Sequence, residues 1–148
     1  MDKELEAKIR DILDNYKVMT LATIRPDGYP QATLVHYVND NLTLYFATDA
    51  ASQKAGNLGL NNKVSLAIAC ETEDAYRLRG LSMSGTAKRV VEPETLQKLQ
   101  MRLFRKIPEA KRLAPANAQQ LAVYEITPVA ISLIDYSSGY GKTTLIEE

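Results

Sequence analysis

A cluster of hydroxyl groups and one lysine is the strongest candidate for a site of chemistry in this chain. It lies in the segment Thr48-Asp49-Ala50-Ala51-Ser52-Gln53-Lys54. Thr48 and Ser52 offer hydroxyl donors, and Lys54 offers a compact positive charge. Ser52 is also a good cap for a helix, and the N–H groups at a helix start attract anions such as phosphate. The segment therefore predicts a phosphate-binding corner; the alternative interpretation is an ordinary helix cap beside a surface lysine.

His36 is the single histidine of the chain. It is a candidate neighbour of a bound flavin ring, a candidate haem ligand, or a core residue. A zinc site needs several His, Cys or carboxylate ligands at suitable spacing, and the sequence offers none around His36. We therefore expect His36 to line a pocket. The spacing supports no Ser-His-Asp set and no pair of carboxylates, so we assign no catalytic residue and no metal site.

The C-terminal segment GYGKTT is similar to a phosphate-binding loop but lacks its spacing. That motif requires a glycine five residues before the Gly-Lys pair, where this chain has Tyr136. We therefore expect residues 136–148 to form a flexible tail, from which Tyr140 and Lys142 could fold over a ligand. The single Cys70 lies in the apolar run KVSLAIAC and is expected to be a small core residue.

Composition places the chain among globular proteins and excludes several classes of partner. Its 148 residues suit one domain, with 45% hydrophobic and 24% charged residues. Lys+Arg and Asp+Glu both number 18, so neither nucleic acid nor a charged membrane surface is an expected partner. The N-terminus MDKELEAKIR contains no apolar signal region, and no apolar run approaches the roughly 20 residues of a membrane span. We expect a cytoplasmic protein.

Hydrophobic periodicity predicts a mainly β chain with peripheral helices. Helices are expected over 3–16 (within an N-terminal segment 1–17), from Ser52 to about Leu60, and from Pro93 to Ile107. Strands are expected over 18–24, 31–38, 42–48, 63–70, 76–91, 123–127 and 129–135, with Pro128 interrupting the last two. Gly80 and Gly85 are expected at bends or bulges. Short turns predict a meander of the first three strands, and the whole predicts an antiparallel barrel of six or seven strands.

Four segments together resemble the pyridoxamine 5′-phosphate oxidase-like family of split barrels that bind flavin mononucleotide (FMN). They are LATIRPDGYPQATLV at 21–35, LYFATDAASQKAGNL at 44–58, NNKVSLAI at 61–68 and SMSGTAKRV at 82–90. They occur in the family order and at family-like spacing, from about Tyr16 to Asp135. The resemblance implies a single FMN-binding split-barrel domain and a small oxidoreductase that acts on a small-molecule redox substrate.

The resemblance also implies where the cofactor would lie. Family members are usually homodimers with two cofactor sites in grooves at the subunit interface. Their second strand lies along the flavin ring, and the end of the third strand with the following helix holds the ring edge and the phosphate. The residues implied here are Thr33, Leu34, Val35, His36, Ala47, Thr48, Ser52, Gln53 and Lys54.

The chain departs from the oxidase itself at several positions. Thr33 and Gln53 stand where the oxidase has arginines, and Val38 stands where it has a lysine, so we expect weaker FMN binding. The chain has no Trp and no Trp- and Arg-rich C-terminal segment, so oxidation of pyridoxamine phosphate is not expected. Two alternatives stay open: a split barrel that binds the deazaflavin F420 or haem, as related ones do, and a non-enzymatic flavin store or redox sensor.

Overall fold

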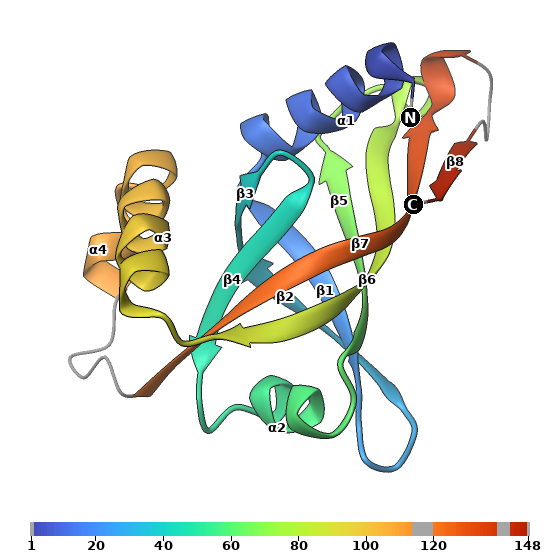
Figure 1. Cartoon of the computed structure of the whole chain (residues 1–148). Helices are drawn as coiled ribbons and strands as arrows, with labels where there is room; N and C mark the ends of the chain where they lie inside the picture. Colours follow the sequence, from blue (N-terminus) through green and yellow to red (C-terminus); the bar gives the residue numbers. More distant parts are fainter. Residues whose placement is uncertain (1, 114–119, 139–142, 148) are drawn as a thin grey trace.

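The computed structural model describes residues 2–113, 120–138 and 143–147 (Figure 1). Its strands form one sheet in the order β2-β1-β5-β6-β7-β4-β3, with β8 paired to β7, and every pairing is antiparallel. The strands are β1 (Val18–Ile24), β2 (Pro30–His36), β3 (Val38–Asp40), β4 (Thr43–Asp49), β5 (Lys63–Cys70), β6 (Arg79–Val90), β7 (Leu121–Asp135) and β8 (Thr143–Glu147). The sheet curls into an open barrel, which confirms the predicted split-barrel fold.

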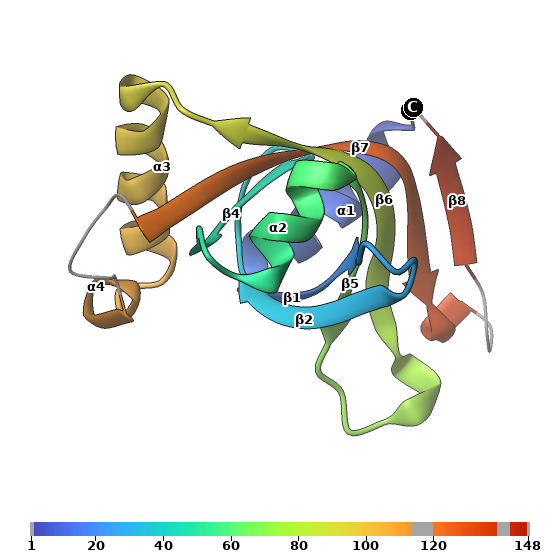
Figure 2. The same ribbon diagram turned by 90° about the horizontal axis from the view of Figure 1, so that it is seen from below.

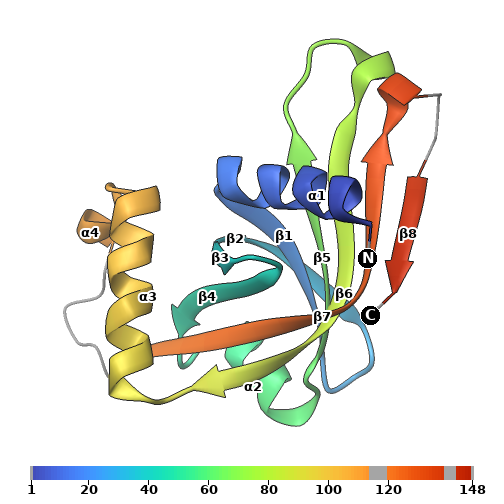
Figure 3. The same cartoon turned by 45° about the horizontal axis from the view of Figure 1, so that its top comes forward.

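Helices lie at the ends and beside the barrel. α1 (Lys3–Asn15) covers one end of the barrel, and α2 (Gln53–Leu60) lies across the opposite end (Figure 2). α3 (Pro93–Lys106) and the short α4 (Ala110–Leu113) stand apart from the sheet on the side of β4 (Figure 3). None of the helices in the described ranges is long and apolar enough to cross a membrane.

The core follows from the alternation of side chains along paired strands. One buried row crosses four neighbouring strands through Leu21, Leu66, Met83 and Ile131, which the register places side by side. Ile9, Ile12 and Leu13 of α1 are buried in the same cluster. Cys70 is also buried, as the sequence predicts. Because successive residues point to opposite faces, the intervening positions lie on the outer face of the sheet.

The predicted meander is wrong beyond its first hairpin. The predicted second strand, residues 31–38, breaks at Tyr37, and Val38–Asp40 forms a separate strand that pairs with β4. β4 pairs on its other side with β7 and not with β2. The break has a packing cause: the Tyr37 side chain is fully buried, and its hydroxyl donates a 3.0 Å hydrogen bond to the Leu13 carbonyl.

Pro128 does not interrupt its strand, contrary to the prediction, because a bulge accommodates it. β7 runs continuously from Leu121 to Asp135, and its register against β6 shifts between Ser84 and Gly85. Gly85 lies opposite Pro128, which confirms the expected bulge there; Gly80 stays in register opposite Ala69. A bulge tolerates a residue that has no N–H to donate to the ladder.

The expected flexible tail is wrong for residues 143–147, which form β8. β4 covers only residues 121–126 along one side of β7, so Ala130–Ile134 would be an unpaired edge. β8 pairs with this edge and satisfies its backbone groups. Tyr140 and Lys142 lie outside the described residues.

Candidate functional site

A groove of about 740 Å³ lies between strands β2 and β4 and helix α3. It occurs where the barrel is open, because β2 ends the sheet on one side and β3 and β4 end it on the other. Six of the nine predicted site residues line it: Leu34, Val35, His36, Ala47, Thr48 and Lys54. Thr33, Ser52 and Gln53 are not among its lining residues. The volume is within the range of about 300–1,000 Å³ that is typical of small-molecule sites.

Strand β2 forms one wall of the groove as an edge strand. Within the described residues it pairs with β1 alone, so half of its backbone N–H and C=O groups are not used by the sheet. Leu34 is 74% exposed and His36 is also exposed, whereas Val35 is half-buried. A planar ligand beside β2 would therefore meet apolar surface and unused backbone hydrogen-bonding groups.

The corner between β4 and α2 holds the predicted helix start and hydroxyl pair, and phosphate binding there stays a prediction. Ser52 caps α2, because its Oγ accepts a 3.1 Å hydrogen bond from the Ala55 N–H. Thr48 Oγ1 and Ser52 Oγ are 3.2 Å apart and share a hydrogen bond. The amide N–H groups of Gln53 and Lys54 belong to the first turn and have no acceptor among the described residues. Of the residues in this corner, Thr48 and Lys54 line the groove.

Lys54 is a half-buried cation without a described counter-ion. Burial lowers the pKa of its ammonium group below the usual value. Within the described residues, no carboxylate lies at ion-pair distance from Lys54. The positive end of the α2 dipole further disfavours a cation at this place. An anion bound here would remove both penalties.

Gln53 points into a network that the sequence analysis missed. Its Nε2 donates a 2.8 Å hydrogen bond to the Oδ1 of Asn57, one turn further along α2. Asn57 is fully buried, and its Nδ2 donates to Thr23 Oγ1 and to Gln31 Oε1. A polar residue on the buried face of a short helix, beside Ala55 and Leu58, was the available signal. A direct contact of Gln53 with a ligand stays a prediction.

Helix α3 forms the wall that sequence reasoning did not assign to the site. Helical periodicity over 93–107 gives one apolar stripe, and its residues Leu96, Leu99 and Leu103 line the groove. No side chain from Pro93 to Lys106 is fully buried, so the stripe does not pack into the barrel core. The α3 residues that line the groove are Pro93, Leu96, Gln97, Leu99, Gln100, Leu103 and Phe104.

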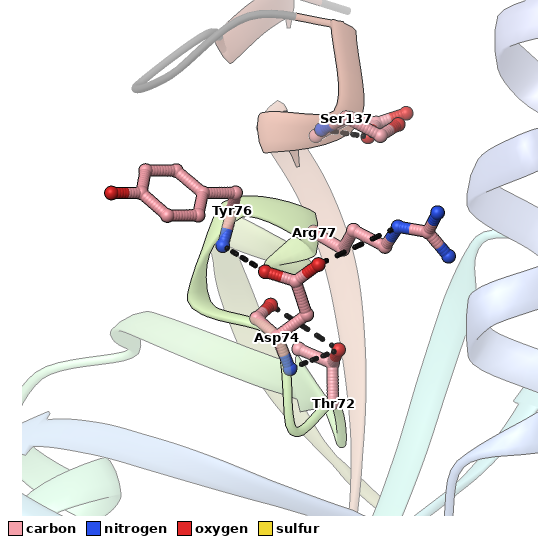
Figure 4. Close-up of polar contacts among 6 residues, drawn as sticks. Thr72, Asp74, Tyr76, Arg77 and Ser137 are labelled. Carbon is pink, nitrogen blue, oxygen red and sulfur yellow. Dashed lines mark hydrogen bonds and ion pairs between the residues drawn. The ribbon is translucent and has the colours of Figure 1, made fainter.

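A second hollow, of about 550 Å³, lies between the β5–β6 connection and the turn after β7. Its Asp74 carboxylate lies 3.7 Å from Arg77 and accepts a hydrogen bond from the Tyr76 N–H (Figure 4), whereas Arg79 lies 4.0 Å from Asp11 of α1. Thr72 also binds the Asp74 backbone. None of the predicted site residues lines this hollow. The described residues contain no group of His, Cys, Asp and Glu that could hold a metal ion.

Comparison with known proteins gives a family match and several relatives. A family profile described as pyridoxamine 5′-phosphate oxidase matches residues 5–135. General stress protein 26 of Bacillus subtilis (strain 168) is 30% identical over 89 residues, which cover 58% of this chain and 60% of that protein. The alignment therefore spans less than two thirds of that relative.

Two solved structures show the same fold. A heme binding protein from Mycobacterium smegmatis has a TM-score of 0.83 at 19% identity, covering 99% of this chain and 59% of that chain. A conserved hypothetical protein from Mycobacterium tuberculosis has a TM-score of 0.78 at 28% identity, covering 93% of this chain and 86% of that chain.

Proposed function

This chain belongs to the pyridoxamine 5′-phosphate oxidase-like family, and we propose that it is a small oxidoreductase that binds FMN in the groove between β2, β4 and α3. The observation that carries the proposal is the state of Lys54. Its half-buried ammonium has no counter-ion among the described residues, at one end of a largely apolar groove. A ring that bears a phosphate group matches such a site, because the ring fits the apolar part and the phosphate would pair with Lys54.

Each part of the groove has a distinct task in this proposal. Lys54, the Thr48 and Ser52 hydroxyls and the first amides of α2 would hold the phosphate. The unused backbone edge of β2 would orient the ring, while Leu34, Ala47 and the α3 stripe would exclude water. A bound flavin carries hydride or single electrons between substrates, and the protein positions it and tunes its potential. No side chain is assigned as a general acid or base.

Haem is the second candidate ligand, and a single observation favours it. His36, the one histidine of the chain, lines the groove and is exposed. Histidine is a common axial ligand of haem iron. F420 is a further alternative, because its phosphate would satisfy Lys54 as FMN would. A flavin store or redox sensor would use the same groove without turnover.

A second copy of the chain would complete the site in this proposal. The outer row beside the buried one runs through Leu34, Thr20, Ala67 and Ser82, all exposed, and none of them carries a charge. Ser65 and Ser84, which pair with each other, are exposed on the same outer face. Leu34 belongs both to this row and to the groove, so a partner on the face would lie beside the cofactor. The proposed assembly is a homodimer.

Absorption spectra of the purified protein, before and after dithionite, test the ligand. Flavin, deazaflavin and haem have different spectra, and reduction bleaches the oxidised flavin bands. We expect a yellow protein whose released cofactor has the mass of FMN. A colourless protein that takes up no added FMN would contradict the proposal, and a haem spectrum that is lost in His36→Ala would favour the second candidate. Reoxidation of the reduced protein by added acceptors separates an enzyme from a store.

A further inference from the structure

The apolar stripe of α3 requires an explanation beyond the phosphate corner. An amphipathic helix normally buries its apolar face in the core, yet Leu96, Leu99 and Leu103 are only half-buried and line the groove. α3 is instead attached near its C-terminus. There Arg102 donates to the Asn39 carbonyl at 3.2 Å, and Lys106 donates to the Leu13 carbonyl at 2.9 Å. The stripe is thus held open toward the groove.

The charge distribution of the groove limits what can lie against this stripe. Among the described residues that line the groove, Lys54 is the only lysine or arginine, and none is acidic. Among the described residues, the part of the groove formed by α3, Phe46, Leu121 and Val123 is lined by apolar side chains and by the neutral amides of Gln97 and Gln100, and none of these side chains carries a charge. Burying an unpaired charge there would be costly.

Two neutral amides accompany the stripe. Gln97 and Gln100 are three residues apart on α3, so they lie on the same side of the helix, and both line the groove. Their N–H groups can donate hydrogen bonds to carbonyl oxygens. An apolar ring with carbonyl oxygens at its edge matches this combination of surfaces.

We infer that the redox partner of the bound cofactor is an uncharged aromatic molecule of the quinone class, which binds against α3. This inference rests on the proposed FMN function. In the reaction the quinone accepts two electrons and two protons from reduced FMN, so that hydroquinone and oxidised FMN result. A hydride donor of the nicotinamide class, together with one proton from solvent, would then return the cofactor to its reduced form.

A matched pair of ligands tests the inference by binding alone. Calorimetric titration of the FMN-loaded protein compares para-naphthoquinone with its ring-sulfonated derivative, which has the same rings and one negative charge. We expect the neutral compound to bind roughly tenfold more tightly or better, because the sulfonate would lose its hydration against the stripe. Equal affinities, or tighter binding of the sulfonate, would overturn the inference.

A pair of variants places the ligand on α3. Leu99→Glu puts a carboxylate into the groove, whereas Met101→Glu puts one on α3 outside the groove lining. We expect Leu99→Glu to weaken naphthoquinone roughly tenfold and Met101→Glu to leave it unchanged. Leu99→Arg should instead improve binding of the sulfonate, a gain that misfolding cannot produce. Equal effects of the two glutamates, or no gain in Leu99→Arg, would overturn the placement.

The FMN affinity of each protein is measured in parallel. If the wild-type chain does not bind FMN, the proposed function fails, and the same titrations on the cofactor-free protein still report whether α3 binds neutral rings. If FMN binds while naphthoquinone shows no preference over the sulfonate, the present inference alone is wrong.

Discussion

The side-chain amide of Asn57 donates a 2.9 Å hydrogen bond to Thr23 Oγ1, although Asn57 is 0% exposed and Thr23 is 2% exposed. The same amide donates to Gln31 Oε1 at 3.1 Å, and Asn57 Oδ1 accepts from Gln53. One buried side chain therefore connects α2 with β1 and β2. This connection orients the start of α2, where Ser52 and Lys54 form the proposed phosphate corner.

Replacing this buried amide should destabilise both the fold and the corner. Asn57→Leu leaves the Thr23 hydroxyl and the Gln31 and Gln53 side chains without their partner, which costs about 1–3 kcal/mol in the free energy of unfolding. Urea denaturation measures that loss, and FMN affinity should fall with it. The control is Asn62→Leu, because the Asn62 side chain is exposed. Equal stabilities of the two variants would show that the network does not contribute to the free energy of unfolding.

The charge of Lys54 should matter for the phosphate and not for the ring. We expect Lys54→Ala to weaken FMN roughly tenfold or more, since a hydrogen bond to a charged group contributes about 1.5–3 kcal/mol. The affinity for riboflavin, which lacks the phosphate, should decrease little in this variant. Lys63→Ala, at an exposed lysine of β5, is the matched control. Fluorescence titration of the wild type and both variants gives the six affinities, and equal losses for FMN and riboflavin in Lys54→Ala would remove the assigned role.

A bulky charge on the outer face of the sheet should separate the proposed dimer. Ala67 lies between Thr20 and Ser82 on this face and is exposed. Ala67→Arg should give a monomer by light scattering, because two copies could not approach closely, and FMN binding should fall with dissociation. Lys63→Arg enlarges an exposed side chain of the same strand and should change neither the oligomeric state nor the FMN affinity. A monomer that retains full FMN affinity would refute a cofactor site at the interface.

Lys106 should make stability depend on pH in the alkaline range. Its Nζ donates to the Leu13 carbonyl and lies 3.9 Å from the centroid of the Tyr37 ring. Burial lowers the pKa of Lys106 from 10.5 to about 8; Asp14 opposes the shift and Lys17 adds to it. Between these two values the folded chain loses this proton while the unfolded chain keeps it. The stability gained from deprotonation of Lys106 is thus complete above pH 10.5. It decreases as the pH falls and is lost once the pH has fallen through about 8.

The corresponding measurement is the free energy of unfolding of wild-type protein minus that of Lys106→Met. We expect this difference to rise between about pH 8 and pH 10, and Lys98→Met, at an exposed lysine of the same helix, should show no such rise. Taking the difference largely cancels Tyr37, whose pKa burial also raises, because both proteins contain it. A flat or falling difference would mean that Lys106 stays protonated in the folded protein.

The sequence by itself determined the features that depend on near neighbours in the chain. The apolar run Lys63–Cys70 predicted a strand, and that strand has the predicted bounds. Ser52 predicted the start of α2, because a cap acts on amides three residues away. The hydroxyls and Lys54 lie within one such local unit, so their proximity was also predictable.

Only the tertiary structure decided which distant segments meet. Asn57 pairs with Thr23 and Gln31, which are 34 and 26 residues away, and no local pattern identifies such partners. Strand pairing also joins segments that are far apart in the sequence. β4 pairs with one part of β7 and β8 with the rest of that edge, because the backbone groups all along β7 need hydrogen-bond partners. The stripe of α3 was visible as a pattern, but a pattern does not say whether core, ligand or partner lies opposite. That depends on the opening between β2 and β4, which exists only once the whole sheet has curled.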